Sequence, residues 1–124
     1  MEMAQVVTTL KGLADQQALK MNALQSCHQA LKQCILDDRE VGEKELGGWL
    51  LDEIKLHFDK ISLVFEHDIL KYPYTDTKIG LYVDDPTSVY LRALKPIGHY
   101  RLITLLNGEV EDTYLVIEVE KADA

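Results

Sequence analysis

The spacing of apolar residues changes partway along the chain, and this change limits the folds available to it. Apolar side chains recur at steps of three and four from Val6 to Ile35, which indicates a helix. From Ile61 onward they alternate with polar side chains, as they do in half-buried strands. No long helical pattern separates these later segments, so neighbouring strands should pair antiparallel. We therefore expect an α+β fold.

Two helices are expected before the strands. The first extends to about Leu36, either unbroken or divided where Gly12 ends one piece and Asp15 caps the next. The second is expected at 43–60, after a polar break at 37–42. The apolar stripe of this second helix contains Leu46, Trp49, Leu50, Ile54, Phe58 and Ile61.

Five strand candidates follow, separated by turn residues. The candidates are 62–67, 78–83, 89–94, 99–106 and 113–120. The turns contain Asp85-Pro86, Pro96 with Gly98, and Asn107-Gly108. We expect one domain spanning 1–124, with a helical layer at 1–60 and a sheet at 61–121. The two helices should pack on one face of a four- to five-stranded antiparallel meander.

The expected strand registers follow from matching apolar positions. Closing the loop at 84–88 would place Leu81 opposite Leu91 and Tyr82 opposite Tyr90.

The last hairpin allows two registers. A two-residue Asn-Gly turn would set Ile103 against Asp112, whereas a four-residue loop at 107–110 sets Leu102 against Leu115. We prefer the second register because it pairs like with like.

Charge is distributed unevenly along the chain. The first 36 residues carry five of its 34 charged side chains, and the other 88 residues carry 29. A helix with so few charged side chains has more than one face that must be shielded from water, which favours assembly with another copy or a partner. We expect a homodimer, with Leu24, Cys27 and Leu31 of the first helix as its self-association residues.

The sheet face turned away from the helices is the candidate partner-binding surface. It would carry Tyr82, Tyr90, Arg92, His99, Arg101, Ile103, Tyr114 and Val116. We single out Tyr82, Tyr90, Arg92, Arg101 and Tyr114, since Tyr and Arg are enriched at binding hot spots. The alternative interpretation is structural, because tyrosine also fits a half-buried pleated strand.

No arrangement of residues indicates catalysis, a cofactor or a metal. Cys27 and His28 are adjacent on a helix, so their side chains diverge by about 100° and do not form a nucleophile and base pair. Glu66 and Asp68 flank His67 without a recognised metal-ligand spacing. The glycine and serine contexts match neither a phosphate-binding loop nor a nucleophile elbow. The sequence therefore favours a binding protein over an enzyme.

The net charge of −8 limits the classes of partner that the chain is expected to bind. It disfavours nucleic acid and an anionic membrane surface, and it is compatible with a basic protein partner. Cys27 and Cys34 lie about 10 Å apart on one helix, too far for a disulfide between them. Reduced thiols, together with no visible signal peptide or membrane span, lead us to expect a cytoplasmic location.

Two functions remain open at this stage. The first is a small acidic protein-binding module, such as an inhibitor, an immunity-type protein or an assembly factor, that self-associates. The alternative is a small-molecule-binding or enzymatic domain with a pocket between helices and sheet. That pocket would be lined by Trp49, Phe58, Tyr100 and His99.

Overall fold

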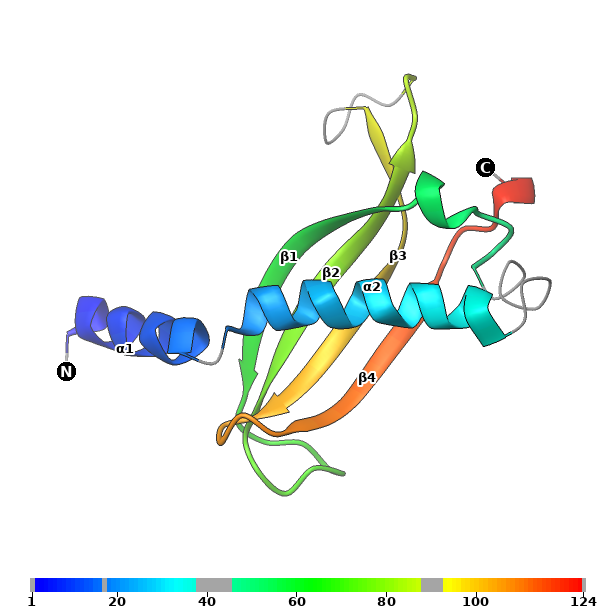
Figure 1. Cartoon of the computed structure of the whole chain (residues 1–124). Coiled ribbons are helices and arrows are strands. Elements are labelled where there is room, and N and C mark those ends of the chain that lie inside the picture. The colour runs from blue at the N-terminus through cyan, green and yellow to red at the C-terminus, as the bar shows by residue number, and fades with distance from the viewer. Residues whose placement is uncertain (1, 17, 38–45, 88–92, 124) are drawn as a thin grey trace.

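A computed structural model describes residues 2–16, 18–37, 46–87 and 93–123. Its centre is a four-stranded antiparallel sheet in the order β1-β2-β3-β4, with a long helix lying across one face (Figure 1). The helices are α1 (Met3–Gln16) and α2 (Leu19–Asp37), and the 3-10 turns are η1 (Leu51–Glu53) and η2 (Lys121–Asp123). The strands are β1 (Lys55–Val64), β2 (Tyr74–Asp84), β3 (Leu94–Leu105) and β4 (Val110–Ile117). The predicted α+β fold with an antiparallel meander is confirmed.

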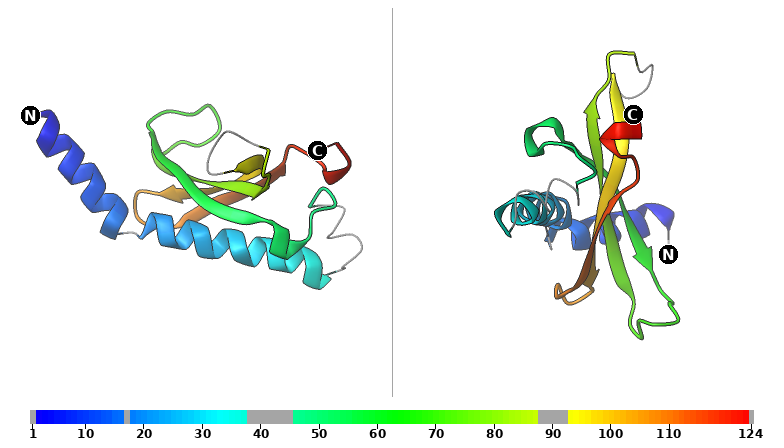
Figure 2. Two further views of the ribbon diagram at one scale, coloured as in Figure 1. Left: turned by 90° about the horizontal axis from the view of Figure 1, so that it is seen from above. Right: turned by 90° about the vertical axis from the view of Figure 1, so that its right-hand side faces the viewer.

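The helical part is one long bent N-terminal helix in two pieces. The bend is not at Gly12, which lies inside α1. It falls between α1 and α2, where Ala18 takes a left-handed backbone conformation with φ 49°. Such a conformation is unfavourable for a residue with a Cβ atom and does not continue a right-handed helix. The chain therefore changes direction here, and α1 extends away from the sheet (Figure 2).

The core lies between α2 and the sheet. Helix α2 presents an apolar residue on every turn, at a spacing of four, so that these side chains form one stripe. The stripe consists of Leu19, Ala23, Cys27 and Leu31, all at most 1% exposed. Facing residues of β2 and β3 complete the cluster, among them Ile79, Leu81, Tyr100 and Leu102. Burial of this stripe is what holds α2 on the sheet.

The predicted helix at 43–60 is wrong over its described part. Gly47 and Gly48 have φ of 69° and 83° and lie in a turn, and β1 begins at Lys55. A β-bulge at Asp59 explains the error, because it shifts the pairing between Phe58 and Lys60. The core-facing residues of β1 are consequently Leu56, Phe58, Ile61 and Leu63. Phe58 and Ile61 are three residues apart across the bulge, a spacing that resembles the pattern of a helix. The sheet therefore begins at Lys55 and not at residue 61.

Strand β3 runs through 95–98, where we expected a turn between two separate strands. The turn predicted around Pro96 and Gly98 lies inside β3, where Pro96 pairs with Tyr82 and Gly98 with Leu81. A β-bulge lies there, with Ile97 as its extra residue. Proline is tolerated within a sheet beside such a bulge, which explains the presence of Pro96 in the strand. Strand β2 thus pairs with 94–105, and the predicted pairing of Leu81 with 91 is wrong. Most of the predicted strand 89–94 lies outside the described residues.

The preferred register of the last hairpin is also wrong. Leu102 lies opposite Thr113, and Ile103 lies opposite Asp112. From Gly98 to Ile103 this is the register that a two-residue Asn-Gly turn would give. The loop itself has three residues, 106–108, because the Leu105 N–H donates to the Glu109 carbonyl, and the pairing shifts between Ile103 and Thr104. Gly108 has φ 94°, a conformation that favours glycine, so the turn chemistry outweighed the matching of leucines.

Candidate protein-binding surface

The sheet has one face that α2 does not cover (Figure 2). We call it the outer face and define it by residues that alternate with the core-facing positions of β1 to β4. They are His57, Lys78, Tyr82, His99, Arg101 and Tyr114. The registers place Lys78 beside Arg101, and Arg101 beside Tyr114, on neighbouring strands. Residues from all four strands therefore meet on this surface.

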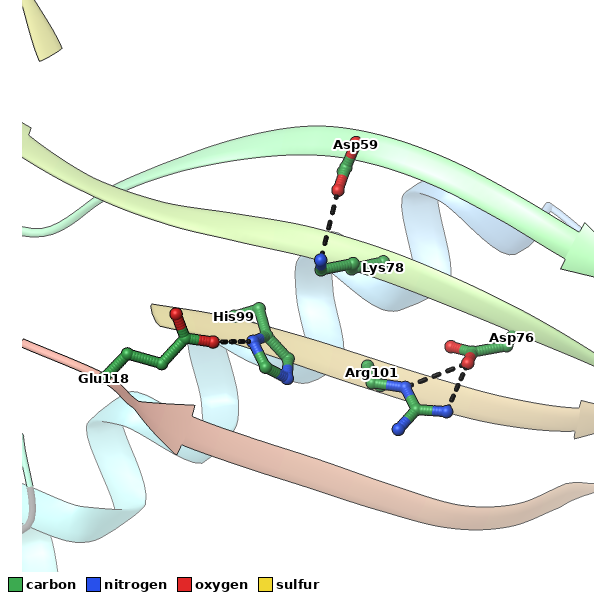
Figure 3. A network of polar contacts seen from close by, with 6 residues as sticks. All are labelled: Asp59, Asp76, Lys78, His99, Arg101 and Glu118. Carbon is green, nitrogen blue, oxygen red and sulfur yellow. Dashed lines mark hydrogen bonds and ion pairs between the residues drawn. The ribbon is translucent and has the colours of Figure 1, made fainter. Parts of the chain in front are cut away.

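An ion pair and a hydrogen bond order polar side chains of this surface (Figure 3). The Lys78 ammonium lies 3.5 Å from an Asp59 carboxylate oxygen. His99 Nδ1 lies 2.8 Å from Glu118 Oε1. The first pair joins β1 to β2, and the second joins β3 to the residue that follows β4. Each pair is partly solvated, so its contribution to stability is at most about 1 kcal/mol. Their main effect is to fix side-chain positions.

Arg101 is held in place on the outer face by two neighbouring side chains. Its Nε donates a hydrogen bond to Asp76 Oδ2 at 2.9 Å, and its Nη2 donates to the same oxygen. These hydrogen bonds raise the pKa of the Arg101 guanidinium above its ordinary value, so the group stays charged. On its other side the guanidinium lies 5.4 Å from the centre of the Tyr114 ring, within cation-π range. Tyr114 is 45% exposed.

A hydrogen bond with Asp112 raises the pKa of the Tyr114 phenol. The phenol therefore keeps its proton near pH 7, directs it at Asp112 and leaves its oxygen to accept a hydrogen bond. Together, Asp76, Arg101 and Tyr114 form a rigid group of one aromatic ring above one fixed cation. We call these three residues the Arg101 cluster.

A second aromatic contact lies nearer the other end of the sheet. The Tyr82 ring meets the His57 ring edge to face, with centroids 5.4 Å apart. Tyr82 also lies over Gly80, where a Cβ atom would come within 2.6 Å of the ring. Gly80 is thus required for Tyr82 to lie flat on the sheet. His57 was missed because 43–60 was predicted to be a helix, whereas Gly80 falls in the predicted strand 78–83, where its contact with Tyr82 was not foreseen.

The structure brings together only some of the predicted partner-binding residues. Tyr82, Arg101 and Tyr114 all lie on the outer face. Tyr90 and Arg92 lie outside the described residues. Ile103, expected on this face, is 2% exposed and is not available to a partner.

The predicted self-association residues lie in the chain's own core. Cys27 and Leu31 are fully buried, and Leu24 packs against the same cluster. Burial raises the pKa of the Cys27 thiol to about 12, so the thiol stays protonated. A second copy of the chain therefore has no access to Cys27 or Leu31 in the folded protein.

The four residues expected to line a pocket do not meet in one. Tyr100 and Trp49 fill the core, and the Trp49 indole N–H donates to the Val119 carbonyl at 2.8 Å. His99 lies on the opposite side of the sheet from Tyr100. Phe58 is partly exposed, with the Lys20 ammonium 5.2 Å from its ring centre.

A half-open cavity of about 300 Å³ lies instead beside α1. We call it the α1 cavity. It is lined by Leu10, Lys11, Leu13, Ala14, Leu19, Ile61, Leu63 and Thr75. Its lining is mostly apolar, without the converging polar groups that usually orient a small molecule.

The described part of the chain contains neither a metal-ligand cluster nor a membrane-spanning helix. Within 2–16, 18–37, 46–87 and 93–123, no three His, Cys, Asp or Glu side chains come together as a metal site would require. No helix in these ranges has both the length and the apolar character needed to cross a membrane.

Comparison with known proteins does not place the chain in a family. No protein-family model matches it, and searches of curated proteins and of solved structures also return no match.

Proposed function

We propose that this chain is a protein-binding module that contacts its partner through the outer face of the sheet. One observation carries the proposal: the Arg101 cluster places an exposed tyrosine over an immobilised arginine on a face that α2 does not cover. Tyr and Arg dominate binding hot spots because each buries a large area while keeping a polar end.

Preorganisation strengthens this argument. A partner that binds a mobile arginine must first order its side chain, at a cost of roughly 0.5–1.5 kcal/mol. Asp76 and Tyr114 already hold the Arg101 guanidinium in place, so most of this cost is met during folding. The remaining guanidinium donors, together with the exposed Tyr114 ring and its accepting oxygen, are what a partner would contact.

The charge of the chain suggests the kind of partner. With a net charge of −8, the chain attracts proteins that carry excess positive charge, which accelerates their association at low salt. An acidic body with a rigid Tyr and Arg contact fits an inhibitor, an immunity-type protein or an assembly factor that acts by covering a partner's surface. We also propose that it acts in the cytoplasm, because Cys27 and Cys34 both remain thiols and form no disulfide.

The test compares two exposed tyrosines. Native mass spectrometry of the untagged protein from its own cells would identify a second polypeptide bound to it. Tyr114→Ala should then weaken binding of that polypeptide by about tenfold or more, which is the loss of a hot-spot residue. Tyr72→Ala is the matched control, because Tyr72 is also exposed but lies in the β1–β2 loop.

The two variants should unfold at nearly the same temperature as the parent, since each removes an exposed ring. Equal partner binding by Tyr114→Ala and the parent would eliminate the outer face as the binding surface. Association that slows with added salt would support a basic partner, whereas a salt-independent rate would remove that part of the proposal.

A further inference from the structure

Helix α1 exposes an apolar stripe along its whole length. At 100° per residue, the stripe occupies an arc of about 120°. It consists of Met3, Val6, Val7, Leu10, Leu13 and Ala14. Met3 is 81% exposed, and Val6, Val7 and Leu10 are 38%, 44% and 43% exposed. Figure 2 shows why: α1 continues beyond the sheet, so its first turns have no described element beside them.

The stripe continues into the α1 cavity at its base. On the α1 side this cavity is lined by Leu10, Leu13 and Ala14. On the side of the protein body it is lined by Leu19, Ile61 and Leu63. Apolar surface therefore extends without interruption from the edge of the sheet to the start of α1. Patches of this kind on soluble proteins usually mark contact sites.

A 14-residue helix is marginal in water without packing along one face. Among the residues that the structure describes, only the last turns of α1 approach the body, through the α1 cavity. The first turns need an apolar partner if α1 is to persist to Met3. We propose that this partner is the α1 helix of a second copy of the chain, running antiparallel.

Charge argues for a second copy over an unrelated basic protein. Within Met3–Gln16 only Lys11 and Asp15 are charged, and they lie outside the stripe. A basic partner gains no attraction from a surface of zero net charge. Two copies with a net charge of −8 repel each other, but least where they meet through such a neutral surface.

The antiparallel direction follows from the same repulsion and from the α1 cavity. With the two-fold axis between Val6 and Val7, Met3 of one copy lies against Leu10 of the other. The flexible Met3 side chain then enters the cavity beside Leu10, and the two acidic bodies lie at opposite ends of the helix pair. A parallel pair would leave both cavities open and place the bodies side by side.

The expected dimer is reversible. Helix α1 is about 21 Å long, and two such helices bury less than the roughly 800 Å² per partner of a standard interface. The oligomeric state should therefore depend on protein concentration. This contact uses neither the Arg101 cluster nor the rest of the outer face, so the two proposals succeed or fail separately.

Sedimentation velocity from micromolar to near-millimolar concentrations tests the dimer. Val7→Asp places two like charges at the two-fold axis and should weaken the dimer by about tenfold or more. Thr8→Asp adds the same charge on the polar side of α1 and should leave it unchanged. A parent protein that stays monomeric throughout, or a Val7→Asp variant that dimerises normally, would overturn the proposal.

Cysteine cross-linking tests the direction, in a Cys34→Ser background. Positions 3 and 10 lie about 10 Å apart within one helix, too far for an internal disulfide. Oxidation of the Met3→Cys/Leu10→Cys variant should therefore yield a covalent dimer, and Met3→Cys alone should not. Efficient cross-linking of Met3→Cys alone would indicate parallel helices and contradict the arrangement. An unchanged circular dichroism spectrum would confirm that each variant is folded.

Discussion

The Ser26 hydroxyl lies 2.5 Å from the Tyr100 hydroxyl and links α2 to the centre of β3. Tyr100 is 2% exposed, so its hydroxyl has little access to water if this contact is lost. A buried hydroxyl without a partner costs about 1–3 kcal/mol. This contact therefore makes α2 and the sheet dependent on each other for stability.

We expect Ser26→Ala and Tyr100→Phe each to lower the free energy of unfolding by about 1–2 kcal/mol. The double variant should lose less than the sum, because neither hydroxyl then remains unpaired. Urea unfolding of the four proteins measures the coupling. Strict additivity would mean that the two hydroxyls do not interact in solution.

Two core-facing threonines of β2 should respond in opposite directions to valine. Thr77 is fully buried, and its Oγ1 has no hydrogen-bond partner among the described residues. Thr75 is also buried, but its Oγ1 donates to the Thr104 carbonyl at 3.1 Å. Thr77→Val should raise the free energy of unfolding by about 1 kcal/mol, and Thr75→Val should lower it by a similar amount. If the unfolding curves have equal slopes, their denaturant midpoints give the direction of each stability change. Destabilisation by Thr77→Val would show that the Thr77 hydroxyl is not an unpaired buried group.

Two glycines should likewise differ on substitution by alanine. A Cβ atom at Gly98 would lie 2.1 Å from the Val116 carbonyl oxygen, which belongs to the backbone of β4. Gly98→Ala must therefore separate β3 from β4, at a cost we place above about 3 kcal/mol. Gly12 lies within α1 with no atom near its Cβ position, and Gly12→Ala should favour that helix by about 1 kcal/mol. Thermal unfolding followed by circular dichroism distinguishes the two, and a well-folded Gly98→Ala protein would contradict this register.

The α+β class could be predicted from the sequence because the helical and the alternating apolar patterns are each long enough to be recognised even where a single residue breaks them. The α2 stripe recurs at every turn from Leu19 to Leu31, and β2 alternates over its eleven residues. Strand β1 was misread because one bulge at Asp59 turns alternation into a step of three. The bulge at Ile97 had a similar effect, since it brings Pro96 and Gly98 into a strand where they resemble a turn.

The candidate surface was partly predicted in spite of the wrong registers. Side chains alternate with a period of two, so an error of two residues leaves each one on its own face. The predicted last hairpin erred in this way, and Arg101 and Tyr114 remained together on the outer face. The ion pair with Asp76 could not be predicted, because it depends on which residues of β2 and β3 lie side by side. The burial of Leu31 in the chain's own core likewise required knowing which face of α2 meets the sheet.

The Cys27 thiol should make stability fall at high pH. Burial raises its pKa from the ordinary value of 9.0 to about 12 in the folded protein. The unfolded chain loses this proton near pH 9, while the folded chain keeps it to about pH 12. The stabilisation is therefore complete below pH 9 and is lost across the window from 9 to 12, by up to about 1.4 kcal/mol per pH unit.

The Cys27→Ala variant isolates this effect, because every other titrating group is common to both proteins. Between pH 8 and pH 10, we expect the parent to lose about 1 kcal/mol more of its unfolding free energy than Cys27→Ala does. The variant should be less stable at pH 8, since it leaves a small cavity beneath α2. Urea unfolding at the two pH values provides the four free energies. An identical loss in both proteins would show that Cys27 ionises in the folded state as readily as in the unfolded chain.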